Sequence, residues 1–282
     1  MDKRIIINAD DFGLCEPVNK AVAQAHTAGV LTSATIMANM PAADEAVEIA
    51  RKLPGLGVGV HLNLSEGAPV SEDGSIACLL NSDGDFTLSV FKLSVLSIAG
   101  HKIRNAIRTE LAAQIQWVLD KGLTPTHLDS HMHIHTLPTI FPIVCELARR
   151  FKIGAIRFTF EPKELCRMPW PLPAEGGRQN AARTRIMAKI NRLQDSRFLK
   201  TDALLGIAHK GKIDVSFFKA LALYSSAQTA EVMTHPGLAD TAGPDETKLQ
   251  HQQRLELEAL CSERTKQYFT DAAIKLLHYG NL

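Results

Sequence analysis

Short apolar runs alternate with helical patterns along the chain, and this alternation restricts the fold more than any other feature of the sequence. Apolar runs at residues 4–9, 31–38 and 57–63 are separated by helical patterns at residues 17–28 and 42–52. Runs of this length are typical of buried strands, and strands separated by helices run parallel because right-handed crossovers connect them. The sequence therefore predicts an α/β fold built on a parallel sheet.

The rest of the chain continues this alternation less regularly. We expect further strands near residues 126–131, 155–158, 203–206 and 230–235, and further helices near residues 110–119, 138–151, 216–224 and about 248–277. Glycine and proline interrupt residues 65–86 and 160–200, which we predict to be loop insertions. A chain of 282 residues matches the usual size of a single-domain (β/α) TIM-like barrel.

Composition restricts the partners and the compartment. The formal net charge is +1, so nucleic acid is not an expected partner. The apolar runs at residues 5–7 and 88–99 are shorter than a signal peptide or a bilayer span requires, so no transmembrane span is predicted. The chain has five widely spaced cysteines and no Cys-x-x-Cys pair: Cys15, Cys78, Cys145, Cys166 and Cys261. This spacing favours a reducing compartment, and we expect a cytoplasmic protein.

Residues 126–135 hold four histidines and one aspartate. In an extended chain alternate side chains share a face, so His127, Asp129 and His131 would point the same way. Histidine is the commonest metal-ligating side chain, and a ligating imidazole is usually oriented by a carboxylate or carbonyl on its other nitrogen. The alternative is a histidine-rich surface turn. The strand-like flanks favour a metal site.

Polar residues also stand at the ends of three other predicted strands: Asp10 and Asp11, His61, and His235. The carboxyl ends of parallel strands share one rim, so these residues should meet the histidine-rich strand there. Two imidazoles and one carboxylate make a metal site with open positions for water and substrate. We predict that Asp11, His61 and His131 bind one divalent ion, and the two imidazoles favour Zn²⁺.

The remaining polar residues suggest hydrolysis, because a divalent ion lowers the pKa of a bound water and polarises a carbonyl oxygen. Asp10 is the predicted base, and His235 the predicted acid for a departing amine. Arg157 would bind substrate or the developing oxyanion, while His127 and Asp129 would bind substrate or orient the ligands. Each assignment has a structural alternative: a helix-capping loop for the aspartates, a core position for lone histidines, and an ion pair for Arg157.

A basic segment follows at residues 178–200, which carry seven Lys and Arg side chains against one Asp. As a helix, this segment would form either a solvated face or a basic flap near an anionic or membrane-borne substrate. The charge alone leaves open whether residues 178–200 approach a membrane surface.

Four motifs resemble a known family. Residues 8–13 (Asn-Ala-Asp-Asp-Phe-Gly), 60–62 (Val-His-Leu), 126–131 (Thr-His-Leu-Asp-Ser-His) and 231–236 (Glu-Val-Met-Thr-His-Pro) are similar, in order and spacing, to those of the YdjC-like carbohydrate deacetylases. The resemblance implies a deformed (β/α) barrel and metal-dependent removal of acetyl groups from N-acetylated sugars. It implies metal binding by the aspartate and two histidines chosen above, Asp10 as the base, and Mg²⁺ as an alternative to Zn²⁺.

The substrate is less well defined than the reaction. Residues 83–86 are similar to a hopanoid-associated branch of the family, which implies an N-acetylated sugar on a lipid, whereas other members act on chitooligosaccharides. We therefore expect a metal-dependent N-deacetylase of a chitooligosaccharide-like or lipid-linked N-acetylglucosamine. The alternatives are a barrel hydrolase of another amide or of a phosphoester, and a non-catalytic sugar- or metal-binding protein. Homodimer formation stays open.

Overall fold

The structure is a computed structural model that describes residues 3–163, 173–194, 197–224, 227–238 and 247–282. Within these residues one sheet has seven strands, all paired in parallel: β1 (Arg4–Phe12), β2 (Ser33–Ile36), β3 (Gly57–Leu62), β4 (Leu128–Ser130), β5 (Ala203–Leu205), β6 (Thr229–Thr234) and β7 (Lys275–Leu276). The strand order is β4-β3-β2-β1-β6-β5, and β7 pairs with β1.

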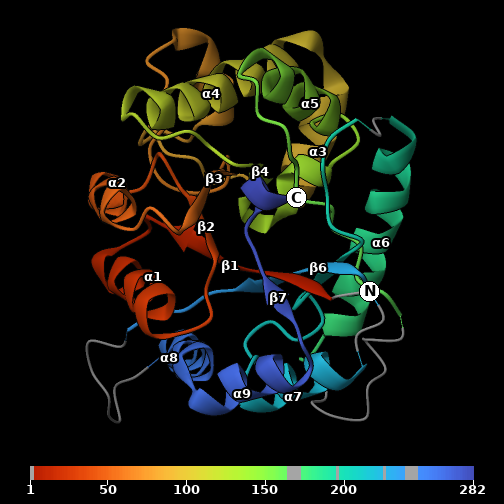
Figure 1. Ribbon diagram of the computed structural model, residues 1–282. Coiled ribbons are helices and arrows are strands. Elements are labelled where there is room, and N and C mark those ends of the chain that lie inside the picture. The colour runs from red at the N-terminus through yellow and green to blue at the C-terminus, as the bar shows by residue number, and fades with distance from the viewer. Residues whose placement is uncertain (1–2, 164–172, 195–196, 225–226, 239–246) are drawn as a thin grey trace.

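Helices surround the curled sheet, as Figure 1 shows. They are α1 (Glu16–Ala28), α2 (Ala43–Lys52), α3 (Val90–Ala99), α4 (His101–Asp120), α5 (Phe141–Arg150), α6 (Gly177–Gln194), α7 (Val215–Tyr224), α8 (Lys248–Cys261) and α9 (Glu263–Asp271). In the same described residues, short 3-10 turns are η1 (Gly74–Leu79), η2 (His131–Thr136) and η4 (Tyr279–Asn281). The predicted α/β class with parallel strands is confirmed.

Strand β1 shows why the chain curls into a barrel. Its residues from Ile5 to Phe12 are buried on both faces of the sheet. Ile5 and Ile7 belong to the main core, whereas Ile6 belongs to a second cluster with Ala155 and Tyr279. Alternate side chains of a strand point to opposite faces, so one face of β1 packs on the helices and the other lies inside the curled sheet.

The gap between β4 and β5 is closed by residues 154–160. Isolated parallel bridges join Leu128 to Ile156 and Ala155 to Leu199. Leu204 N–H donates to the carbonyl of Phe160 at 2.9 Å. The strand predicted at residues 155–158 is therefore present only as this irregular ladder, and the sheet forms a deformed barrel.

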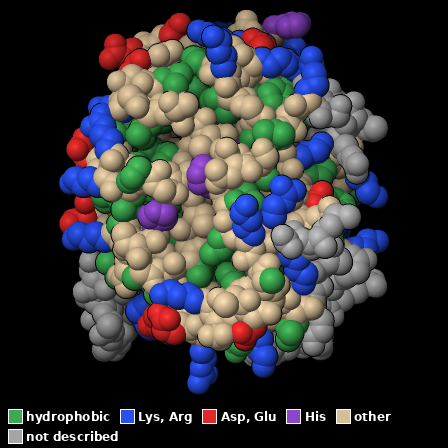
Figure 2. All heavy atoms as spheres, in the orientation of Figure 1, with side chains coloured by type: hydrophobic (Ala, Val, Ile, Leu, Met, Phe, Trp, Pro, Cys, Tyr) green, Lys and Arg blue, Asp and Glu red, His purple; other side chains and the backbone are tan. Residues whose placement is uncertain are grey.

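The C-terminal segment corrects another expectation. The helices predicted up to residue 277 end at Asp271 with α9, and Lys275 and Leu276 form β7 beside Arg4 and Ile5. The segment then runs across the barrel end in Figure 1, and Figure 2 shows this face filled across its centre. This covered end holds the first residues of β1, so the carboxyl ends of the strands lie at the other end of the barrel.

Other boundaries differ from the predictions. Residues 65–86 contain η1, and the apolar run at residues 88–99, for which the sequence indicates no helix of the barrel, forms α3. Helix α6 ends at Gln194, and residues 197–200 are not helical. Parts of the expected loop at residues 160–200, namely 164–172 (with Cys166) and 195–196, lie outside the described residues. In the described chain, each helix is too short or too polar to cross a membrane.

Candidate active site

A cavity of about 590 Å³ lies at the carboxyl ends of the strands. Asp10, His61, His131 and His235 line it together, although they come from β1, β3, the turn after β4 and the end of β6. Their convergence follows from the parallel sheet, in which every strand delivers its last residues to the same rim.

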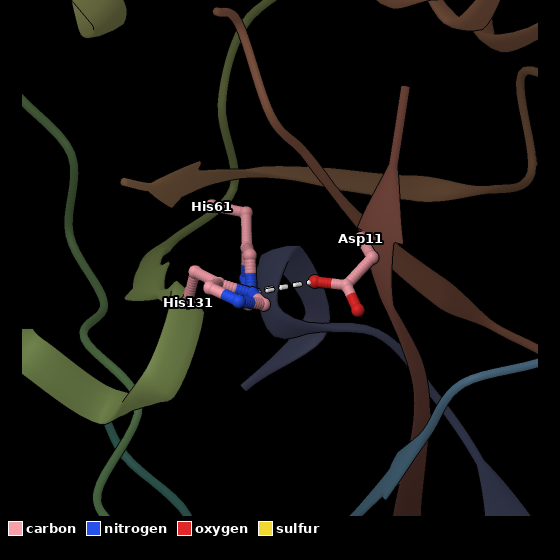
Figure 3. A group of neighbouring side chains, drawn as sticks. All are labelled: Asp11, His61 and His131. Atoms are coloured by element: carbon pink, nitrogen blue, oxygen red, sulfur yellow. Dashed lines mark hydrogen bonds and ion pairs between the residues drawn. The ribbon is translucent and has the colours of Figure 1, made fainter. Parts of the chain in front are cut away.

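Three predicted ligands, Asp11, His61 and His131, meet at this rim (Figure 3). Asp11 Oδ1 lies 2.9 Å from His131 Nδ1 and 3.3 Å from His61 Nε2. Asp11 has a φ of +63°, and the ladder between β1 and β2 is irregular between Ala9 and Phe12. A non-glycine residue in this left-handed region is uncommon and is often found at functional sites.

His61 is oriented from inside the barrel. Its Nδ1 lies 2.7 Å from Asp129 Oδ1 and 3.1 Å from Thr35 Oγ1, which leaves Nε2 facing Asp11. Burial lowers the pKa of His61, but Asp129 and Asp11 outweigh burial and raise it to about 10. The site therefore favours positive charge next to these carboxylates.

Arg157 is the central cation behind the site. Its fully buried guanidinium donates to Asp10 at 2.7 and 2.6 Å, and it pairs with Asp129 at 2.8 Å and Glu231 at 2.7 Å. Burial raises the pKa of the Asp10 carboxyl, but Arg157 outweighs burial and holds it well below its usual range. Arg157 and Asp129 thus lie behind the cavity wall. Asp129 orients His61, and Arg157 forms ion pairs, which are the alternatives that the sequence left open for these two residues.

Several interior polar residues were not singled out from the sequence. Asn8 donates to Asp10 Oδ1 at 2.9 Å, and Thr35 donates to Asp129 Oδ2 at 3.1 Å. Glu231 accepts from the hydroxyl of Tyr279 and from Arg157. A polar or charged side chain inside an otherwise apolar strand is the signal that identifies such positions, because a buried polar group needs a partner.

His235 follows β6 and lines the cavity. Its backbone N–H donates to Glu256 Oε2 at 2.6 Å, and its Nδ1 has no hydrogen-bond partner within the described chain. Burial, followed by the charge of Lys210, lowers the pKa of His235 to about 4. Lys210, which also lines the cavity, was not predicted from the sequence.

The other histidines of residues 126–135 have separate surroundings. His127 stacks on Tyr279 with ring centroids 3.9 Å apart, at the barrel end opposite the rim, and burial holds its pKa well below the usual value. His135 Nδ1 lies 2.5 Å from Ser130 Oγ inside η2. His131 also approaches Glu66 at 3.1 Å, a contact from the loop after β3 that the sequence did not indicate.

Comparison with known proteins gives the family. A family model described as "YdjC-like protein" matches residues 4–271. The chain belongs to the YdjC-like family. A carbohydrate deacetylase of Brevibacillus brevis is 31% identical over 280 residues, covering 99% of both chains. A carbohydrate deacetylase of Geobacillus stearothermophilus is 32% identical over 281 residues, covering 99% of this chain and 98% of that one.

A solved structure extends this likeness to the fold. The crystal structure of a putative cellobiose-phosphate cleavage protein from Enterococcus faecalis V583 aligns with a TM-score of 0.78 and 26% identity, covering 100% of this chain and 99% of that one. The resemblance inferred from four short motifs is thus confirmed over the whole YdjC-like chain.

The donor atoms of this YdjC-like site fit a divalent cation. One nitrogen or oxygen from each of Asp11, His61 and His131 lies within 4.8 Å of the other two. The Asp129 contact with His61 provides the carboxylate–imidazole support that metal-ligating histidines usually have. The mixture of two nitrogens and one carboxylate suits Zn²⁺ and other divalent ions of similar preference.

Proposed function

We propose that the protein is a metal-dependent hydrolase that removes the acetyl group from an N-acetylated sugar. The observation that carries this proposal is the meeting of Asp11, His61 and His131 with Asp10 and His235 at one cavity. The relatives named carbohydrate deacetylases support the substrate class.

Asp11, His61 and His131 would hold the ion. When bound, a divalent ion polarises the acetamide carbonyl and lowers the pKa of a nearby water. Asp10 stands beside this group, and Arg157 keeps its carboxylate ionised. Asp10 would accept the proton of the attacking water; the same Arg157 contact weakens it as a base, so Asp10 would hold this proton only briefly.

His235 would deliver a proton to the departing amine. With a pKa lowered to about 4, its imidazole is neutral at pH 7 and first has to receive a proton during the reaction. Negative charge that develops on the substrate oxygen favours this step, because a nearby anion raises the pKa of an imidazole. The unpartnered Nδ1 of His235 is available for this transfer.

The first experiment measures acetate release from N,N'-diacetylchitobiose by the purified protein, with chelator and after re-addition of Zn²⁺ or Mg²⁺. We expect acetate release that chelator abolishes and the ion restores. An N-acetylglucosaminyl lipid is the second acceptor, and a phosphoester panel tests the alternative hydrolase by phosphate release. Phosphate release without acetate would refute the proposed reaction.

Variants separate metal binding from proton transfer. His131→Ala should lose both the bound ion, measured as metal per chain, and acetate release, because it removes one of three ligands. Asp10→Asn should keep the ion but lose activity by roughly 10²-fold or more, because the amide cannot accept a proton. His101→Ala, exposed on α4, is the control. Metal-loaded Asp10→Asn with wild-type activity would exclude Asp10 as the base.

A further inference from the structure

Helix α3 exposes an apolar stripe next to the cavity. Phe91, Val95 and Ile98 are 80%, 52% and 68% exposed. Their spacing of four and three residues places them on one helix face, while Leu93 and Ser97 are buried on the opposite face. Phe91 also lines the cavity, so the stripe begins at the cavity mouth and runs away from it.

Helix α6 bounds the same cavity from another side, through Asn180, Arg183 and Thr184. Arg183 is exposed at the cavity, whereas Ile186 and Lys189 are exposed beside a separate pocket. The cavity mouth thus lies between an apolar helix face and a basic helix.

The sequence regions that contain these two helices have a net positive charge. Residues 86–109 and 176–194, which include α3, the start of α4 and α6, contain nine Lys and Arg, three of them on α4, and no Asp or Glu. The rest of the chain has 22 Lys and Arg against 30 Asp and Glu, a formal charge of −8. Some of these cations have protein partners, such as Arg108, which pairs with Glu146. The net charge of the two regions is nevertheless opposite in sign to that of the rest of the chain.

We propose that α3 and α6 form a docking surface for an anionic lipid bilayer around the cavity mouth. Exposed large apolar side chains flanked by Lys and Arg are the two features of interfacial membrane binding, because the apolar groups enter the acyl boundary while the cations meet anionic headgroups. A protein partner could cover the apolar stripe alone. The acid-free regions, which both reach the same cavity, favour a negatively charged surface.

The test is co-sedimentation of the full-length protein with vesicles, without any substrate, so its outcome is independent of the proposed deacetylation. We expect binding to phosphatidylcholine vesicles with roughly one-third phosphatidylglycerol, weak binding to phosphatidylcholine alone, and release by salt. Val95→Ser with Ile98→Ser should lower the partition coefficient by about tenfold or more. Arg183→Gln, at the cavity mouth on α6, should lower it by about fivefold.

Matched controls change equivalent residues on other helices. Leu223→Ser replaces a leucine of α7 that is 62% exposed, and Lys219→Gln removes an exposed cation of α7. Both should bind vesicles as the wild type does. All altered side chains are exposed, so we expect unchanged thermal midpoints.

Three results would overturn the proposal. They are no binding to anionic vesicles, equal binding to neutral and anionic vesicles, and unchanged binding of the α3 or α6 variants. Light scattering identifies a rival occupant. A dimer that Val95→Ser with Ile98→Ser converts to a monomer, without vesicle binding by the wild type, would assign the apolar stripe to a second copy of the chain.

Discussion

At the scale of single residues, the site depends on how buried charges are compensated. Asp10, Asp129 and Glu231 all contact the one guanidinium of Arg157. A planar guanidinium can serve several carboxylates at once because it presents five donors in fixed directions. Arg157 therefore fixes Asp10 at the cavity wall while holding Asp129 against His61.

Replacement of Arg157 tests this arrangement. Arg157→Met should lower the free energy of unfolding by about 3–5 kcal/mol, because it leaves buried carboxylates without a counter-charge. Urea denaturation measures the change. Arg108→Met, which breaks the largely exposed pair with Glu146, is the control and should cost about 1 kcal/mol or less. Equal stability of the two variants would contradict the central role of Arg157.

At the scale of elements, the strands bring small and large side chains into register inside the barrel. Strand β3 has Gly59 where a Cβ would lie 2.5 Å from His127 Cε1 and 2.8 Å from Thr35 Cγ2. The missing side chain gives room for the His127 ring, two residues before Asp129. Helix α8 also positions a residue of the site, because Glu256 accepts a hydrogen bond from the backbone N–H of His235.

Gly59→Ala should therefore destabilise the protein by about 1–3 kcal/mol through overpacking. Gly154→Ala is the matched control, since an added Cβ there meets nothing within 4 Å. Thermal or urea unfolding compares the two variants. A Gly59→Ala variant as stable as Gly154→Ala would show that His127 can move without cost.

Glu256 gives a prediction for pH. Burial raises its pKa from 4.5 to about 7. A carboxyl that holds its proton more tightly when folded stabilises the protein below pH 4.5, and this contribution is lost as the pH rises through about 7. Relative to wild type, Glu256→Gln should become more stable by about 3 kcal/mol over this window. Urea unfolding at several pH values measures the difference.

The control for this comparison is Glu258→Gln, which alters an exposed carboxylate on the same helix. A difference between wild type and Glu256→Gln that stays constant with pH would contradict the raised pKa of Glu256. A Glu256→Gln variant that becomes less stable relative to wild type as the pH rises would also contradict it.

At the scale of the whole molecule, the barrel is held together by contacts between distant parts of the chain. The C-terminal segment pairs with β1, and Tyr279 stacks on His127 while its hydroxyl donates to Glu231. Residues 154–160 join β4 to the segment before β5. The C-terminal contacts close the end of the barrel opposite the cavity, and residues 154–160 close the gap in the sheet between β4 and β5.

Tyr279→Phe should keep the stack on His127 but leave Glu231 Oε2 without its hydroxyl donor. We expect a loss of about 1–3 kcal/mol, because the oxygen is buried and its partner is removed. Tyr268→Phe, a partly exposed tyrosine of α9, is the control and should change stability little. Chemical denaturation of both variants checks the prediction, and equal midpoints would contradict it.

The sequence by itself determined the parallel α/β class and the main candidates for the site. Apolar runs and helical periodicity report burial within a few residues, and the polar residues at Asp11, His61 and His131 stand where strands end. The family motifs added the expected reaction. These signals are local or lie at fixed spacings, so they can be identified without knowing which strands become neighbours.

Only the tertiary structure decided which distant residues contact one another. It brought Arg157 into contact with three carboxylates, paired residues 275–276 with β1, and brought residues of α3 and α6 to the same cavity. Arg157 and Asp10 are 147 residues apart, and Tyr279 and Glu231 are 48 apart. Such pairings depend on the register and closure of the whole barrel, which no short stretch of sequence encodes, because each partner's position is set by packing elsewhere.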